Sequence, residues 1–549
     1  MATDTDMATD TDMAKKNRRP LPNPLAIILG LLVVTPVCAQ QSTAGAIPQP
    51  AIGAAASLES GGAGQAGGAG RTWSIKPRIG LTMTATDNVN VSGGAKGEND
   101  LITEVAPGIR IEARTARLRG YFDYSLRNQL YLKNNGDRRQ HGLNAMATLE
   151  AVDDWLFIDL SGNISQQAIS AFGTQSPSDA SLNNNMTETA TYRVSPYIRG
   201  QLGGFADYLV RYNASTTKAD ASNASDVDLG QWVGQLRGST PFQSLKWSID
   251  ANRQTTEYSN GNKTDADLLR ALATYLITPQ FSISASAGWE RNNYASLDQE
   301  SRNTYGYGFD WSPTPRTKIS AFKEDRFFGN GHRFSFSHRF PRSTIRYTDT
   351  RDVSVLPNQF ATTGMGSIYD ILFEQYATQI PDPLVRAAYV NLMLALQGIN
   401  PNAQVTSGFL SSRASVQRLQ QLALVMQGVR NSLTLQFNRS ENSSLLAANA
   451  LADDFSQSTA VRQRGVSLTF SHRLSALSNL NATASRQVSD GNNNGTGSLK
   501  TTTTNYSVSL STKLGAKTTG SLSLRHSDFD NATNPYTENA LVGALTYTY

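Results

Sequence analysis

The sequence predicts an all-β protein, a transmembrane antiparallel up-and-down β-barrel of about 22 strands, within a range of roughly 18 to 24. Three observations predict this fold. Apolar and polar residues alternate over most of the chain after residue 73. Short connections that often contain Gly or Pro alternate with long polar ones. The chain also ends, over residues 541–549, with apolar and hydroxyl side chains at opposite parity, which in a strand places them on opposite faces.

Residues 1–39 have the layout of a secretory signal peptide. Four basic residues between positions 15 and 19 precede an apolar stretch at 25–34, and cleavage after Ala39 is expected. The segment MATDTD is repeated at the start, so a later Met is an alternative first residue. Lipidation of Cys38 is a rival interpretation, but it needs a small residue where Val37 stands. Cleavage would remove Cys38, the only cysteine, and would exclude disulfides, iron–sulfur clusters and thiol catalysis from the mature chain.

The composition suits an exported barrel. Only 39% of residues are hydrophobic, yet the chain holds 20 Phe, 20 Tyr and 6 Trp. A barrel of this kind is expected to be low in hydropathy because half of each strand faces water. The formal net charge of +5 is small for 549 residues, so we expect no nucleic-acid partner. Beyond the leader no run of 18 apolar residues occurs, so no transmembrane helix is predicted.

The mature chain divides into a linker and a barrel. Residues 40–72 are rich in Gly, Ala and Ser and read as a flexible linker, and residues 73–549 form the predicted barrel. In the first predicted strand, 73–86, Trp73, Ile79 and Leu81 alternate with polar residues. Short turns are predicted near 115–116, 152–153, 202–203, 242–243, 279, 314–315, 341–342, 428–429, 475–477 and 515–516. An even number of strands places both ends on the periplasmic side.

One segment breaks the strand pattern. Residues 357–411 form a long insertion, and 368–376 and 383–396 have helical spacing. A connection this long is usually functional or independently folded. We expect it to lie at the outer mouth or to fold into the lumen, where it could act as a gate.

The chain is not expected to be an enzyme. It holds five histidines, and no HExxH, GxSxG or P-loop motif is present. His338 and His472 lie near predicted short turns and are interpreted as residues of the membrane interface. We predict no cofactor and no metal site. A soluble β-sandwich array lacks the repeat it would need, and a TonB-dependent transporter would need a folded plug before the barrel.

The predicted inward face carries mixed charges. These candidate pore-lining residues are Arg78, Arg110, Glu112, Arg117, Arg119, Asp123, Arg127, Arg211, Lys246, Asp250, Asp310 and Lys318. One interpretation is a hydrated wall whose charges pair across strands. The other is a lumen adapted to a long polar substrate, including an anionic one.

The last strand carries a predicted assembly signal. Leu545, Tyr547 and Tyr549 match the spacing that the barrel-assembly machinery recognises at the C-terminus of outer-membrane proteins. This strand is also expected to pair with the first one, which would close the barrel and leave no open edge.

Several stretches resemble the PEP-CTERM system-associated outer-membrane β-barrel family over roughly residues 73–549. They are TDNVN at 86–90, DLITEVAPGI at 100–109, AVDDWLF at 151–157, WSPTPRT at 311–317, RFFGN at 326–330 and GVRNSLTL at 428–435. The resemblance implies a Gram-negative outer membrane, an exosortase sorting system and a linked exopolysaccharide locus. It supplies no catalytic residues.

The resulting functional hypothesis is a channel or secretion conduit for exopolysaccharide export. The alternatives are a general porin or nutrient channel, and a structural or adhesive barrel that anchors its outer loops. Expected partners are outer-membrane lipid and lipopolysaccharide, the barrel-assembly machinery and periplasmic polysaccharide-export components.

Overall fold

The computed structural model describes residues 72–549, except 94–96, 135, 222–223, 243, 297, 356–408, 446–452 and 492–498. The described residues belong to one compact unit. The predicted signal peptide, all but the last residue of the linker, and the two helices expected within the insertion lie outside this part of the chain. Among the described residues, no helix has the length and apolar character needed to span a bilayer.

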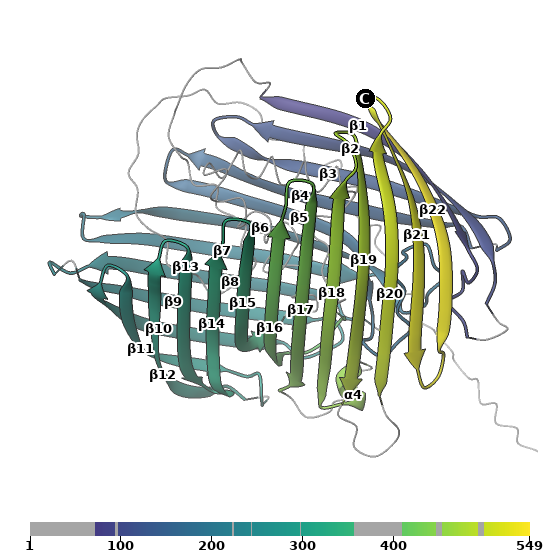
Figure 1. The fold of residues 1–549 in the computed structure, drawn as a ribbon. Helices are drawn as coiled ribbons and strands as arrows, with labels where there is room; N and C mark the ends of the chain where they lie inside the picture. The colour runs from purple at the N-terminus through teal and green to yellow at the C-terminus, as the bar shows by residue number, and fades with distance from the viewer. Residues whose placement is uncertain are drawn as a thin grey trace, which may run out of the picture. The chain divides into compact units, whose positions relative to one another are not determined.

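The described chain folds into 22 antiparallel strands (Figure 1). They are β1 Trp73–Thr86, β2 Asp100–Arg114, β3 Leu118–Tyr131, β4 Arg138–Val152, β5 Leu156–Ala168, β6 Met186–Leu202, β7 Ala206–Ala219, β8 Val227–Ser239, β9 Leu245–Tyr258, β10 Thr264–Thr278, β11 Phe281–Asn292, β12 Glu300–Thr314, β13 Thr317–Arg326, β14 Gly329–Arg339, β15 Ser343–Ser354, β16 Ser415–Gln427, β17 Asn431–Ser444, β18 Ala460–Arg473, β19 Ser478–Gly491, β20 Lys500–Lys513, β21 Thr518–Asn531 and β22 Tyr536–Thr548. A short helix, α4 Asp454–Gln457, precedes β18.

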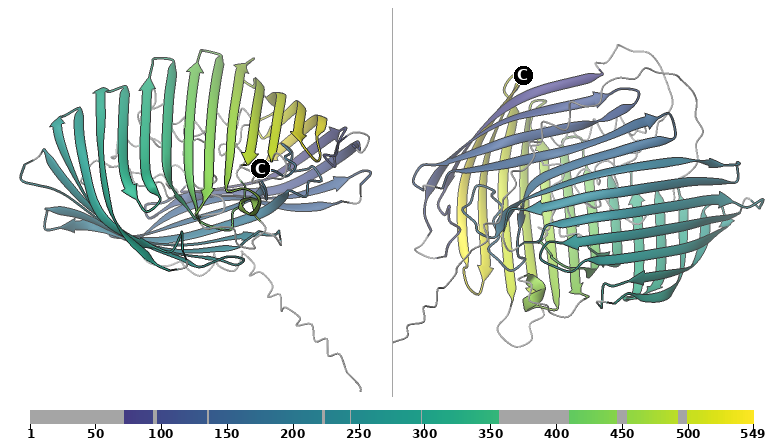
Figure 2. Two further views of the ribbon diagram at one scale, coloured as in Figure 1. Left: turned by 90° about the horizontal axis from the view of Figure 1, so that it is seen from below. Right: turned by 180° about the vertical axis from the view of Figure 1, so that it is seen from behind.

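The sheet closes on itself (Figure 2). Each strand pairs with the next along the chain, and β1 pairs with β22 from Arg78↔Thr548 to Thr86↔Ala540. The backbone N–H of Tyr549 donates to the carbonyl oxygen of Pro77 at 2.9 Å, so the last residue takes part in the closure. The predicted strand number and the pairing of first and last strands are confirmed.

Connections alternate between short and long, as predicted. All ten connections that lead from an even to an odd strand are short and lie at the positions expected from the sequence. The β6–β7 turn uses Gly203 and Gly204 in the left-handed region, with φ of +54° and +75°. The β13–β14 connection differs from the other odd-to-even connections because it holds only Phe327 and Phe328. Gly329 at φ +90° permits this tight reversal.

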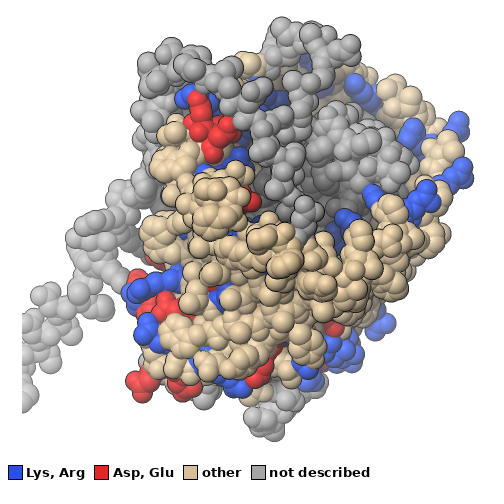
Figure 3. Space-filling view, turned by 90° about the vertical axis from the view of Figure 1, so that its left-hand side faces the viewer, with Lys and Arg blue, Asp and Glu red and all other residues tan. Residues whose placement is uncertain are grey.

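The two faces of the wall differ in chemistry. On β1, Ile79, Leu81 and Met83 are each more than 40% exposed, whereas Thr84 and Thr86 are buried on the other face. Similar exposed apolar residues occur along the other strands, including Trp232, Tyr305, Leu468 and Leu524. Figure 3 shows one side of the wall, with uncharged residues across its middle and charged residues gathered toward its edges. A closed sheet with an apolar exterior satisfies every backbone group in lipid. The protein is therefore an outer-membrane β-barrel.

Candidate functional site: the inner wall and the outer mouth

The structure places the predicted charged residues on the face opposite the exposed apolar side chains. The register aligns Arg110 with Asp123 across β2 and β3, and Arg78 with Gly108 across β1 and β2. Lys246, Asp250, Asp310 and Lys318 share this inward parity on β9, β12 and β13. Their place on the inner face is thus clear. Their role in lining a conducting pore stays a prediction.

One charged network lies on β1, β2 and β3. The Arg78 guanidinium donates two hydrogen bonds to the Asp123 carboxylate, at 2.9 and 2.5 Å. Arg110 donates to Glu112 at 2.9 Å and lies 3.6 Å from Asp123. These groups are 20–38% exposed, so the network is partly shielded from water. The network therefore links three neighbouring strands of the wall through their side chains.

Other inward charges are paired in the same manner. Arg211 lies 3.0 Å from Asp159 and over the ring of Tyr197. Arg270 joins Asp250 at 3.2 Å to Glu324 at 3.5 Å across β9, β10 and β13. The interpretation of a wall whose charges pair across strands therefore holds for these residues.

The remaining candidates fall into two groups. Arg117 pairs with Asp153 between two neighbouring short turns, at 2.8 Å. Arg127 pairs with Asp179, which lies on a loop rather than a strand, also at 2.8 Å. The second group has no ion-pair partner in the described part of the chain. Its members are Arg119, Lys246, Asp310 and Lys318.

A second sector of the inner wall carries almost no charge, and the sequence analysis did not identify it. We call the inward face of β16–β20 the neutral sector. On β17 it presents Ser432, Thr434, Gln436, Asn438, Ser440, Asn442 and Ser444; on β19 Asn479, Asn481, Thr483, Ser485, Gln487 and Ser489; and on β20 Thr501, Thr503, Asn505, Ser507, Ser509 and Ser511. Among the described residues of this sector, the inward charges are Arg473 and Lys513, which end β18 and β20 beside their short turns. Hydroxyl and amide groups thus replace the ion pairs of β1–β13.

The outer end of the barrel is crossed by the connection between β5 and β6, residues 169–185, which we call the mouth loop. Toward the end of the loop, the Leu182 N–H donates to the carbonyl oxygen of Val89, on the β1–β2 connection, at 2.8 Å. The Ala180 carbonyl accepts a hydrogen bond from the Tyr131 hydroxyl at 2.8 Å. Val89, Ile102, Tyr131 and Leu182 form a small apolar cluster there. The loop therefore packs against the inner side of the wall.

The same loop also reaches strands that are distant around the barrel. The Thr501 hydroxyl on β20 donates to the Ala171 carbonyl at 3.2 Å, and the Tyr536 hydroxyl on β22 donates to the Gln175 carbonyl. Both side chains have inward parity. Around the closed sheet, the shorter way from β5 to β20 passes through six strands, β4, β3, β2, β1, β22 and β21. The mouth loop thus spans the inside of the barrel.

The start of the mouth loop is held by α4. The Asp454 carboxylate accepts from the Ser170 hydroxyl at 2.5 Å and from the Ala171 N–H at 2.7 Å. Ala171, Phe409, Phe455 and Val461 form an apolar cluster around this contact. Burial raises the pKa of Asp454 to about 6.

A buried ion pair supports α4. Arg413 donates two hydrogen bonds to Asp453, at 2.9 and 2.6 Å, and both side chains are about 5% exposed or less. Because Asp453 directly precedes α4, this pair fixes the helix to the start of β16. It therefore also supports the residue that holds the mouth loop.

Only residues 409–411 of the predicted insertion are described. Phe409 forms a parallel bridge with Ala168, and the Leu410 N–H donates to the Ala168 carbonyl at 3.2 Å. This end of the insertion lies at the outer mouth, one of the two expected places. Gating by the insertion stays a prediction.

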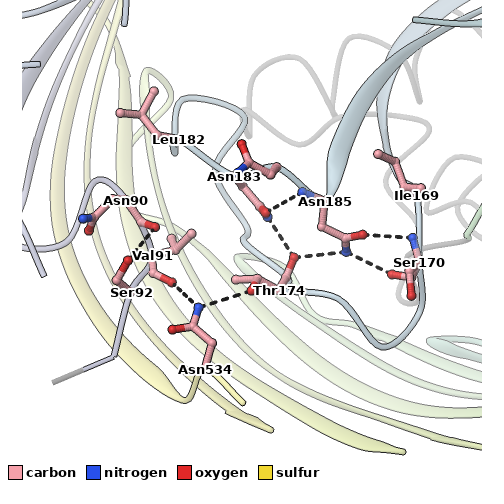
Figure 4. A pocket seen from close by; sticks show the side chains of 11 residues that line it. Asn90, Val91, Ser92, Ile169, Ser170, Thr174, Leu182, Asn183, Asn185 and Asn534 are labelled. Carbon is pink, nitrogen blue, oxygen red and sulfur yellow. Dashed lines mark hydrogen bonds between the residues drawn. The ribbon is translucent and has the colours of Figure 1, made fainter. Parts of the chain in front are cut away.

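Beside the mouth loop lies a cavity of about 400 Å³ (Figure 4). Its lining is uncharged and rich in amides, with Asn90, Asn183, Asn184, Asn185 and Asn534 among the residues. The Asn534 side-chain amide donates to the carbonyl of Val91 at 3.0 Å and to the hydroxyl of Thr174 at 3.3 Å. The cavity can offer hydrogen bonds to a polar solute without a net charge.

The two histidines predicted at the membrane interface lie on the outer face beside short turns. His338 bonds to the Thr317 hydroxyl at 2.7 Å and contacts the ring of Phe340. His472 bonds to the side chain of Asn431 at the next hairpin. These contacts agree with an interfacial role.

No family model matches the chain, and no curated protein matches it. Solved structures with similar barrels include the FrpB iron transporter from Neisseria meningitidis, F5-1 variant in its apoprotein form. It is 9% identical over 87% of this chain and 81% of that chain, with a TM-score of 0.49. The siderophore receptor PirA is another. The Pseudomonas aeruginosa protein is 8% identical over 86% and 80%, with a TM-score of 0.43. The Acinetobacter baumannii protein is 7% identical over 86% and 80%, with a TM-score of 0.47. Likeness at this level identifies neither a substrate nor a partner.

Proposed function

We propose that the protein is an outer-membrane conduit for an uncharged, hydroxyl-rich polymer, with exopolysaccharide as the substrate class. The neutral sector is the observation that carries this proposal. The resemblance to the PEP-CTERM-associated family adds the link to exopolysaccharide, and the outer-membrane barrel supplies the passage.

The chemistry of the neutral sector suits a sugar polymer. Each sugar hydroxyl donates and accepts hydrogen bonds, and Ser, Thr, Asn and Gln side chains can do both. Passage requires contacts that are numerous but individually weak, so that the polymer can leave as well as enter. A wall of ion pairs offers fewer groups to a sugar, because its charged side chains already bond to one another.

Within the described part of the chain, some polar atoms of the inner wall are enclosed by neighbouring residues without a hydrogen-bond partner. Ser440 Oγ and Asn442 Nδ2 on β17, Asn505 Oδ1 on β20 and Ser527 Oγ on β21 have no hydrogen-bond partner among the described residues. All four have inward parity. Since unpaired polar groups are costly away from water, each of these buried atoms is expected to bond to an ordered water, and contacts with a solute fall to the more exposed hydroxyl and amide groups of the sector.

Polymer blockade in planar bilayers tests the proposal. The full-length barrel is reconstituted, and small-ion current is recorded while neutral dextran oligomers are added. We expect dextran to produce transient blocks, and Asn438→Asp together with Ser507→Asp to shorten them while the small-ion current persists. The matched control is Ser335→Asp on β14, an inward serine outside the neutral sector and opposite Ser320 of β13. Blocks of equal duration in both variants would contradict a role for the neutral sector.

A general porin is the second candidate, and the paired charges of β1–β13 favour it because charged walls are common in diffusion pores. Ion conductance without any dextran block would support the porin over the conduit. An absence of conductance would support the anchoring barrel. Export itself is tested by comparing secreted polysaccharide in cells with and without the gene. Equal amounts would overturn the exopolysaccharide assignment.

A further inference from the structure

The outer wall of β15–β20 carries a row of basic residues where the apolar band ends. These strands lie side by side in Figure 1. On β18, Val466, Leu468 and Phe470 face outward nearest the short turn, and Arg464 is the next outward residue toward the long loops. The same change occurs on β17, where Leu435 and Phe437 precede Arg439. The basic residues therefore lie at the outer boundary of the membrane.

We call this row the basic belt. Its cations are Arg351, Arg418, Arg439, Arg462, Arg464, Arg486 and Lys500, and the carboxylates on the same outward positions are Asp349, Glu441 and Asp490. Three ion pairs use all three carboxylates: Arg418 with Asp349 at 2.7 Å, Arg462 with Glu441 at 3.1 Å, and Arg464 with Asp490 at 2.7 Å. The other four cations have no carboxylate partner among the described residues.

Two pairs of belt cations lie directly opposite each other, whereas Arg462 lies opposite Glu441 and Lys500 opposite Asp490. Arg439 lies directly opposite Arg464 across β17 and β18, and Arg351 directly opposite Arg418 across β15 and β16. Arg486 is diagonal to Arg464, since Arg464 is opposite Val488. Like charges at directly opposite positions destabilise an antiparallel pair. Such an arrangement is stable when an anion lies between the cations.

The belt is confined to one side of the barrel. The outward positions of β7–β13 carry Lys218, Arg253, Arg291 and Lys323, together with Asp228, Glu257, Asp265, Asp267 and Asp325. There Asp267 bridges Arg253 at 3.7 Å and Arg291 at 2.7 Å. That side therefore neutralises its own arginines, whereas the belt leaves an excess of positive charge.

We propose that the basic belt binds the phosphate groups of a phosphorylated lipid in the outer leaflet, with Arg439, Arg464 and Arg486 at its centre. Arginine suits this role because its planar fork makes two parallel hydrogen bonds to phosphate oxygens. The apolar residues directly below the belt would contact the acyl chains of the same molecule. A lipid that carries both phosphate and acyl chains satisfies both features of the wall, whereas a free anion satisfies only one.

The test compares lipid binding by the folded full-length barrel in a zwitterionic detergent. The probes are lipid A with both phosphates, the same lipid after removal of its phosphates, and inorganic phosphate. The variant is Arg439→Gln with Arg464→Gln and Arg486→Gln, and the matched control is Arg253→Gln with Arg291→Gln on the opposite side. We expect the belt variant to weaken binding of phosphorylated lipid A by at least about tenfold, and the control by less than about twofold.

Several outcomes would overturn the proposal. These are equal binding by the belt variant and the wild type, equal binding of lipid A without phosphates, and displacement of the lipid by millimolar inorganic phosphate. Folding is checked by the heat-dependent mobility of the barrel in gel electrophoresis. If the triple variant does not fold, Arg439→Gln alone replaces it in the binding test. A second readout excludes a merely structural role. Without lipid, the belt variant should resist thermal unfolding at least as well as the wild type, because repulsion has been removed.

Discussion

Docking of the mouth loop should depend on pH through Asp454. Burial raises the pKa of this carboxyl group from 3.8 to about 6 when the loop is docked. A carboxyl group with a raised pKa favours the docked state most when it is protonated. The favourable contribution is therefore fully present below about pH 4 and is lost as the pH rises through about 6.

The size of the effect follows from the shift. A change of about two pKa units corresponds to about 3 kcal/mol, or roughly a hundredfold change in the ratio of docked to undocked loop. Both hydrogen bonds to Asp454 come from the loop, from the Ser170 hydroxyl and the Ala171 N–H. The titration thus acts directly on the contact that holds the loop.

A spin label can report this change without titrating itself. Pro177 is an exposed residue of the mouth loop, and Pro177→Cys gives a labelling site once the leader with Cys38 is absent. We expect a restricted label at pH 4 and a progressively more mobile one as the pH rises to about 6, with little further change up to pH 8. Asp454→Asn should remove the pH dependence, and Asp298→Asn, in another outer loop, should leave it unchanged. A label that becomes more mobile as the pH falls would refute the reasoning.

Three further predictions concern other parts of the barrel. Arg413→Ala leaves Asp453 buried without its partner, so we expect a loss of about 3–5 kcal/mol in local stability, measured by proteolysis of the outer loops; an unchanged cleavage rate would contradict it. Tyr549→Asp should lower the yield of assembled barrel, measured by gel mobility, while single-channel conductance per assembled barrel stays the same. Deletion of residues 357–407 should raise single-channel conductance if the insertion is a gate, and equal conductance would rule that role out.

The strands could be predicted because their signal is local. On β1 and β22 each face is identified by residues two positions apart, as with Ile79 and Leu81 or Tyr547 and Tyr549. The short turns were equally accessible, since Gly and Pro mark them within a few residues. A closed antiparallel barrel then follows from the strand number and from the need to pair both edges.

The mouth loop could not be predicted because its contacts join distant parts of the chain. Ser170 and Asp454 are separated by 284 positions, and the Tyr536 hydroxyl reaches a residue 361 positions away. The sequence shows 169–185 only as one of several long polar connections. The pairing of Arg127 with Asp179 on this loop was also hidden, since Arg127 reads as one more inward charge.

The neutral sector and the basic belt are two faces of the same strands. On β18, Gln463 and Ser467 face inward, whereas Arg464 and Val466 face outward. Because the side-chain period of a strand is two, a shift of one residue would exchange these faces. It would send arginines into the neutral sector and amides to the membrane boundary. The sequence of β16–β20 is therefore constrained on both faces at once, by an inner surface that is uncharged except beside the short turns and by an outer boundary with excess positive charge. The strands β1–β13 do not show this contrast between an uncharged inner face and a basic outer face, since they carry charges on both faces. A separate requirement on each face explains why uncharged and basic residues alternate in this sector.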